Sequence, residues 1–133
     1  MTERRFCIKK FKRICYLALV ATTLFSVSAF AADSSFSFTL SPSSGAKYST
    51  LATKGNDYSF STVTVSGTNG YKFKYAIATG TYTGYKTSWK TKQGNGTFDI
   101  SYTSKPSRGT GLRLHGATVT NSGTSTISGT WRP

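Results

Sequence analysis

Few residues in this chain could carry acid–base, nucleophilic or metal chemistry. His115 is the single histidine, and after residue 31 the only carboxylate side chains are Asp33, Asp57 and Asp99. General acid–base catalysis usually needs a histidine or carboxylate pair whose environments separate their pKa values. A small hydrolase would need His115 beside a buried acid, and no Gly-x-Ser-x-Gly nucleophile motif occurs. One histidine without a cysteine in residues 32–133 cannot build a zinc site. The sequence therefore predicts a non-enzymatic protein with no catalytic residues, no metal site and no cofactor.

Lysine and aromatic residues alternate in the middle of the chain. The pattern covers residues 71–77 and 85–92, and its lysines are Lys72, Lys74, Lys86, Lys90 and Lys92. If the two stretches form paired strands, these five side chains share one surface with cross-strand neighbours roughly 5 Å apart. Like charges held that close favour an anion among them, so we expect an anion-binding face. The competing interpretation is that the lysines protect strand edges against aggregation.

Two tyrosines flank a glycine in the turn region between those stretches. Tyr82 and Tyr85 lie on either side of Gly84, and as exposed rings they would stack on a sugar or a lipid headgroup. Such tyrosines also commonly form the rim of a core. Together with Trp89 they support an alternative function, that of a carbohydrate-binding or adhesive module.

The elements that must position these residues are strands. Apolar and polar residues alternate with a period of two, and no helical period occurs, which predicts half-buried antiparallel strands. The expected strands cover 34–40, 58–65, 71–79, 85–92, 98–103, 112–119 and 126–131. We therefore predict an all-β fold, an antiparallel sandwich or small barrel of about seven strands joined mostly as a meander.

Three local features refine this expectation. Residues 47–57 show no sustained period and are expected to form a loop. The change of phase in the second strand predicts a bulge near Ser61 and Thr62. The Asn69-Gly70 pair predicts a hairpin between the second and third strands, because it supplies two positive φ angles at low cost.

The first 31 residues have the pattern of a secretory signal peptide. A basic head with six lysines and arginines precedes the uncharged run Ile14 to Val27, and small residues stand at Ala29 and Ala31. The run of about 14 residues is short for a lasting membrane span, although a retained N-terminal anchor is the alternative. We expect a signal helix at 1–31, cleaved by signal peptidase, and a single all-β domain at 32–133. Cys7 and Cys15 would leave with the signal peptide.

The remaining domain is strongly basic. Of 17 lysines and arginines 11 remain, and three of four acids remain, so the net charge of residues 32–133 is 11 − 3 = +8. Such a field favours anionic partners and weakens with salt. We expect the partner to be an anionic polymer or lipid surface of a cell envelope, with no specific nucleic acid. The charge could also serve solubility alone.

The last eight residues, Thr-Ile-Ser-Gly-Thr-Trp-Arg-Pro from Thr126, carry a resemblance. With the signal peptide and the Ser/Thr/aromatic body, this ending looks like small uncharacterised exported proteins of Gram-positive bacteria. The layout is also similar to the lactococcin-type secreted β-sandwich bacteriocins, which attack cell-wall synthesis. The resemblance implies an extracellular protein, either a bacteriocin-like effector or a cell-wall-associated protein, and it transfers no site residue.

Overall fold

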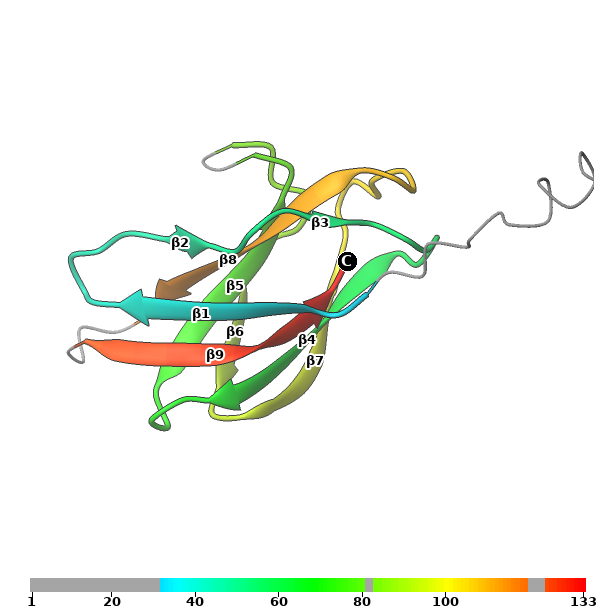
Figure 1. Cartoon of the computed structure of the whole chain (residues 1–133). Coiled ribbons are helices and arrows are strands. Elements are labelled where there is room, and N and C mark those ends of the chain that lie inside the picture. The colour runs from blue at the N-terminus through cyan, green and yellow to red at the C-terminus, as the bar shows by residue number, and fades with distance from the viewer. Residues whose placement is uncertain (1–31, 81–82, 120–123) are drawn as a thin grey trace, which may run out of the picture.

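The structure is a computed structural model that describes residues 32–80, 83–119 and 124–133 (Figure 1). These residues form no helix and build an all-β sandwich, as predicted. In sequence order the strands are β1 (Ser34–Leu40), β2 (Lys47–Tyr48), β3 (Ala52–Thr53), β4 (Phe60–Gly67), β5 (Lys72–Ala78), β6 (Lys90–Gln93), β7 (Gly96–Ser101), β8 (Gly111–Thr118) and β9 (Ser125–Arg132). The expected signal peptide lies outside the described residues, and within them no helix could cross a membrane.

The strands form two antiparallel sheets that pack face to face (Figure 1). Sheet A has the order β1-β9-β4-β7, and sheet B has the order β2-β8-β5-β6 with β3 also paired to β8. Among the described strands only β5 and β6 are both consecutive and paired. The expected meander is therefore wrong, because most connections cross from one sheet to the other.

The Asn69-Gly70 turn illustrates why the meander prediction failed. Gly70 has a φ of 80°, but the φ of Asn69 is not positive, so the two-residue hairpin turn is not formed. The segment leads instead from β4 in sheet A to β5 in sheet B. No hairpin forms there, so that prediction is also wrong. A turn signal reports local backbone geometry and says nothing about which strands the turn brings together.

Two further expectations need correction in this part of the chain. Residues 47–57, expected to be a loop, include the short strands β2 and β3, which pair with the edge of β8. The predicted bulge near Ser61 is absent, since β4 pairs with β7 without interruption from Phe60 to Val65. The register shift lies instead between Val65 and Gly67, against β9.

The core lies between the sheets and is built by the apolar faces of most of the strands. Its aromatic and aliphatic members come from seven strands: Phe36, Phe38, Leu40, Ala52, Val63, Val65, Phe73, Tyr75, Ile77, Ile100, Leu112, Leu114, Ile127 and Trp131. Gly116 of β8 lets the sheets approach closely, because a Cβ at that position would lie 2.7 Å from a ring carbon of Phe38. Aromatic side chains thus supply buried apolar area in a core that has few aliphatic residues.

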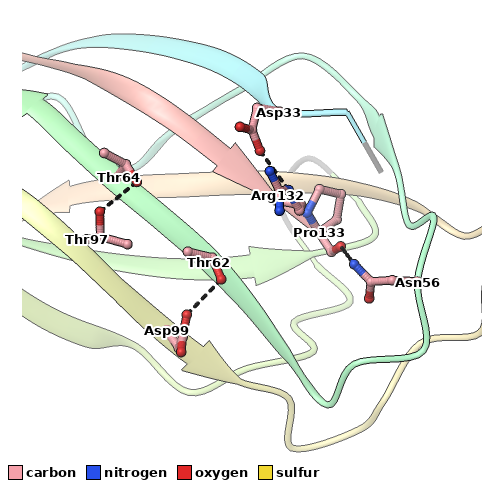
Figure 2. Close-up of polar contacts among 8 residues, drawn as sticks. All are labelled: Asp33, Asn56, Thr62, Thr64, Thr97, Asp99, Arg132 and Pro133. Carbon is pink, nitrogen blue, oxygen red and sulfur yellow. Dashed lines mark hydrogen bonds and ion pairs between the residues drawn. The ribbon is translucent and has the colours of Figure 1, made fainter. Parts of the chain in front are cut away.

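Hydroxyl groups line the outer face of sheet A. Thr62 donates a hydrogen bond of 2.7 Å to the Asp99 carboxylate, and the Thr64 and Thr97 hydroxyls lie 2.9 Å apart (Figure 2). Arg132 pairs with Asp33 at 2.8 Å on the same face (Figure 2). Two of the three aspartates of the domain are therefore engaged on sheet A.

A buried lysine ties the loop after β3 to the rest of the sandwich. The Lys54 ammonium donates to Asn56 Oδ1 at 3.1 Å and to the Tyr58 carbonyl at 2.9 Å. It also lies 4.7 Å from the centre of the Tyr102 ring, while Asn56 Nδ2 donates to the Pro133 carbonyl (Figure 2). Burial lowers the pKa of Lys54, the charge of Lys105 lowers it further, and Asp57 raises it.

Candidate functional site

The outer face of sheet B gathers aromatic and cationic side chains. In the register of the sheet, Lys74 of β5 lies opposite Ala117 of β8, and Ala76 lies opposite His115. His115 in turn lies opposite Tyr48 of β2. Directly opposed residues of antiparallel strands share a face, so these side chains all point away from the core.

The alternation of β8 explains why a histidine stands on this face. Leu112 and Leu114 are fully buried in the core. Because successive side chains of a strand point to opposite faces, Arg113 and His115 point to the outer side of sheet B. Residues 83–86 then pair alongside the end of β5. Tyr85 bridges to Ala78 at the end of β5, and this brings its ring over His115.

Six side chains form a continuous row, which we call the cation–aromatic row. Its members, in order, are Lys74, Trp89, Tyr85, His115, Tyr48 and Arg113. The Lys74 ammonium lies 5.2 Å from the Trp89 ring centre, and Trp89 lies 5.5 Å from Tyr85. The Tyr85–His115 and His115–Tyr48 ring centres are 5.2 and 5.8 Å apart. The Arg113 guanidinium lies 5.6 Å from the Tyr48 ring centre. The row therefore ends in a cation on both sides.

His115 fixes the middle of the row. Its Nε2 lies 3.2 Å from the Gly80 carbonyl oxygen, which can only accept, so Nε2 carries the proton and donates. Nδ1 can then accept from the Tyr85 hydroxyl at 3.4 Å. Burial lowers the pKa of His115, the Gly80 hydrogen bond raises it, and the charge of Arg113 lowers it. A neutral imidazole thus holds Tyr85 in place.

Three aromatic rings of the row are accessible to a ligand. Tyr48 is 38% exposed, Tyr85 40% and Trp89 37%, whereas His115 is buried. A cleft of about 810 Å³ adjoins the row at Tyr48 and Tyr85 and carries Lys47 on its wall. The carboxylates of Asp33 and Asp99 are engaged on sheet A. The row therefore combines flat apolar rings with the positive charges of Lys74 and Arg113, neither of which forms an ion pair with a carboxylate of the described residues.

The register of β5 and β6 separates the lysines that were expected to share one surface. Lys90 lies opposite Tyr75, and Lys92 lies opposite Phe73, so both point to the inner side of sheet B. Lys90 donates to the Asp99 carbonyl of β7 at 2.7 Å. Lys74 lies on the outer face of sheet B. Lys72 lies on the same face, because it is two residues away on the same strand. The prediction of one five-lysine surface is therefore wrong for Lys90 and Lys92.

Lys86 lies in the irregular segment between β5 and β6. Its backbone N–H donates to the Ile77 carbonyl, and its carbonyl accepts from the Thr103 N–H, so it links sheet B to the end of β7. The sequence period alone could not set the register, because the alternation of residues 85–92 permits either of its faces to point to the core. A shift of one residue in the pairing exchanges the two faces of a strand. In the structure Trp89 points outward and Lys90 points inward.

The aromatic candidates have separate outcomes. Tyr82 lies outside the described residues, and Tyr85 stands at the centre of the cation–aromatic row. Sequence reasoning missed Tyr48, Arg113 and His115 as members of this site. The Leu112–Leu114 alternation carried the signal for Arg113 and His115, whereas nothing in the sequence around Tyr48 indicated a strand.

The structure also places the residues considered for catalysis and metal binding. Both ring nitrogens of His115 are engaged, one by a carbonyl and one by a tyrosine, in place of the serine and carboxylate of a hydrolase. Among the residues the structure describes, no three histidines, cysteines or acidic residues gather in a way that could hold a metal ion. Comparisons with protein-family models, curated proteins and solved structures find no match.

Proposed function

We propose that this protein is a secreted, cationic, non-enzymatic β-sandwich that binds an anionic polymer or lipid surface of a cell envelope. The observation that carries the proposal is the cation–aromatic row, with its exposed rings between Lys74 and Arg113. Cations attract phosphate or carboxylate groups, and aromatic faces stack on rings or acyl chains between them. The row therefore suits a ligand that alternates charge with apolar surface.

The charge of the domain acts in the same direction. The net charge of +8 over residues 32–133 follows from 11 basic and 3 acidic residues. It raises the local concentration of a polyanion around the whole molecule, while the row selects the face that makes contact. The signal-peptide pattern at 1–31 supports export, and the protein would act outside the cell as a bacteriocin-like effector or as a wall-associated protein.

Retention on surfaces of controlled charge tests this proposal. We expect the protein to bind teichoic-acid-bearing walls and phosphatidylglycerol vesicles, and to be released as the salt concentration rises. Walls stripped of teichoic acid and phosphatidylcholine vesicles should retain little. Equal retention on anionic and neutral surfaces would reject the proposal.

A pair of charge-matched variants tests whether the row is the contact face. Lys74→Gln with Arg113→Gln should weaken binding about thirtyfold, from roughly 1 kcal/mol per cation near an anionic surface. Lys105→Gln with Arg108→Gln removes one lysine and one arginine from an exposed loop away from the row. This control should bind within about threefold of the wild type. Equal losses in the two variants would show that net charge, and not the row, governs binding.

A carbohydrate-binding or adhesive role is the second candidate, favoured by the exposure of Tyr85 and Trp89. In that case neutral glycans should bind, salt should have little effect, and Trp89→Ala should abolish binding. Lys74→Gln with Arg113→Gln should then leave binding nearly unchanged. A glycan array without hits on neutral sugars would exclude this role.

A further inference from the structure

The edge strand β1 offers a second interaction surface, which borders the same cleft as the cation–aromatic row. β1 is the first strand of sheet A and pairs on one side with β9 (Figure 1). Every second backbone N–H and C=O group of an edge strand points away from its neighbour, ready to pair with another strand. β1 has seven residues, from Ser34 to Leu40, and none is charged or proline.

The other sheet edges are short or carry charge. β2 and β3 have two residues each, and β6 has four, including two lysines. β7 carries the charge of Asp99, and the carbonyl of that residue accepts a hydrogen bond of 2.7 Å from Lys90 of β6. Charged side chains and short length are the usual protection of sheet edges. Among the described strands, β1 is thus the long edge without that protection.

The sequence of β1 is nearly symmetric about Ser37. If a second copy of β1 runs antiparallel with the two Ser37 residues opposed, Phe36 meets Phe38 of the second copy on the inner side. On the outer side Ser35 meets Thr39 of the second copy. The inner pair would continue a core to which Phe36 and Phe38 already belong, and the outer pair would continue the hydroxyl contacts of sheet A, such as Thr39 with Thr126 at 3.1 Å.

Open space borders both ends of the β1 edge. The cleft of about 810 Å³ is lined on one side by Ser37 to Thr39. A second cleft, of about 430 Å³, lies beside Ser34 and is lined by Leu51, whose side chain is 57% exposed. An added strand would therefore meet concave surface and an exposed apolar side chain.

We propose that β1 pairs with β1 of a second copy of this chain about a two-fold axis at Ser37, which joins two A sheets into one continuous sheet. A two-fold contact is self-complementary and closed, so it yields a dimer and not a fibre. Each copy carries a charge of +8 over residues 32–133, from 11 basic and 3 acidic residues. Repulsion between copies opposes this association, and β1 itself adds no charge to that repulsion.

Salt separates this proposal from the proposed function. Screening weakens repulsion between two cationic copies, so dimerisation should strengthen as salt rises. Binding of an anionic surface should weaken over the same range. The two proposals can therefore fail independently.

Sedimentation velocity of the full chain with Cys7→Ser and Cys15→Ser, across protein and salt concentrations, tests the dimer. We expect a monomer–dimer equilibrium that Ser37→Lys weakens at least about tenfold, because two like charges would face each other across the axis. Ser101→Lys introduces the same charge at an exposed position of the opposite edge strand, β7, and should retain the dimer. A wild-type monomer at every concentration would overturn the proposal, and so would equal behaviour of the two variants.

A cross-linking measurement does not depend on the effect of an added charge. Ser37→Cys in the same background should form a disulfide-linked dimer on mild oxidation, because the two sulfur atoms would face each other across the axis. Ser101→Cys should remain monomeric under the same conditions. Failure of Ser37→Cys to cross-link faster than Ser101→Cys would also overturn the proposal.

Discussion

The contact between Lys74 and Trp89 can be tested by a double-mutant cycle on protein stability. The ammonium of Lys74 lies 5.2 Å from the centre of the Trp89 ring, and both side chains are on the outer face of sheet B. The cycle compares the wild type, Lys74→Ala, Trp89→Ala and the double variant. It measures the coupling between the two side chains free of their other contacts.

The expected coupling follows from the exposure of the pair. A cation over an aromatic face contributes about 0.5–1 kcal/mol at exposed sites, and Trp89 is 37% exposed. Trp89 also contacts Tyr85 at 5.5 Å, and such pairs contribute about 0.5–1.5 kcal/mol. Trp89→Ala alone should therefore lower the unfolding free energy by about 1–2.5 kcal/mol, of which about 0.5–1 kcal/mol disappears in the Lys74→Ala background.

Urea unfolding followed by far-UV circular dichroism is the suitable assay, since Trp89→Ala would alter the fluorescence signal. Lys72 provides the matched control, because it lies on the same strand and face as Lys74 without a described contact to Trp89. The Lys72–Trp89 cycle should give a coupling near zero. A Lys74–Trp89 coupling no larger than the Lys72 control would refute the register that places Trp89 on the outer face.

Three further predictions concern the sandwich itself. Gly116→Ala should lower the unfolding free energy by about 1–3 kcal/mol, because its Cβ would meet the Phe38 ring at 2.7 Å; a loss under about 0.5 kcal/mol in urea titrations would contradict this packing. Burial lowers the pKa of His115 in the folded protein, so the unfolded chain binds the proton more tightly. The contribution of His115 to the unfolding free energy is therefore complete above the usual pKa of 6.5 and decreases as the pH falls below that value. His115→Gln should flatten that part of the profile in thermal unfolding, and an unchanged slope would contradict the assignment. Lys54→Met should cost about 1–3 kcal/mol, since the Tyr58 carbonyl loses a charged donor; equal or higher stability in urea would speak against this role.

The fold class could be predicted because alternation is a local property. Phe36 and Phe38 alternate with serines, and the structure buries the two rings between the sheets. The same holds for Val63 with Val65 in β4 and for Leu112 with Leu114 in β8. Each pattern predicts which face of its strand is buried and which is exposed to solvent, and it does so without information on the neighbouring strands.

The pairing of strands could not be predicted in the same way. β1 begins the described domain and β9 ends it, yet the two strands pair along their whole length. Lys90 and Lys92 point inward because they lie opposite Tyr75 and Phe73 of β5, whereas the alternation of β6 alone permits either face. Tyr48 joins the cation–aromatic row only because the two-residue strand β2 pairs with β8.

The proposed function depends on which face of the sandwich binds the anionic ligand. Chemical-shift mapping of the isotope-labelled protein, titrated with soluble polyglycerol phosphate at low salt, answers this directly. We predict that the largest shifts occur at the Trp89 indole and at Lys74, Tyr85 and Arg113, with little change along β9. Shifts centred on the hydroxyl-lined face of sheet A, or none at saturating polymer, would contradict the account.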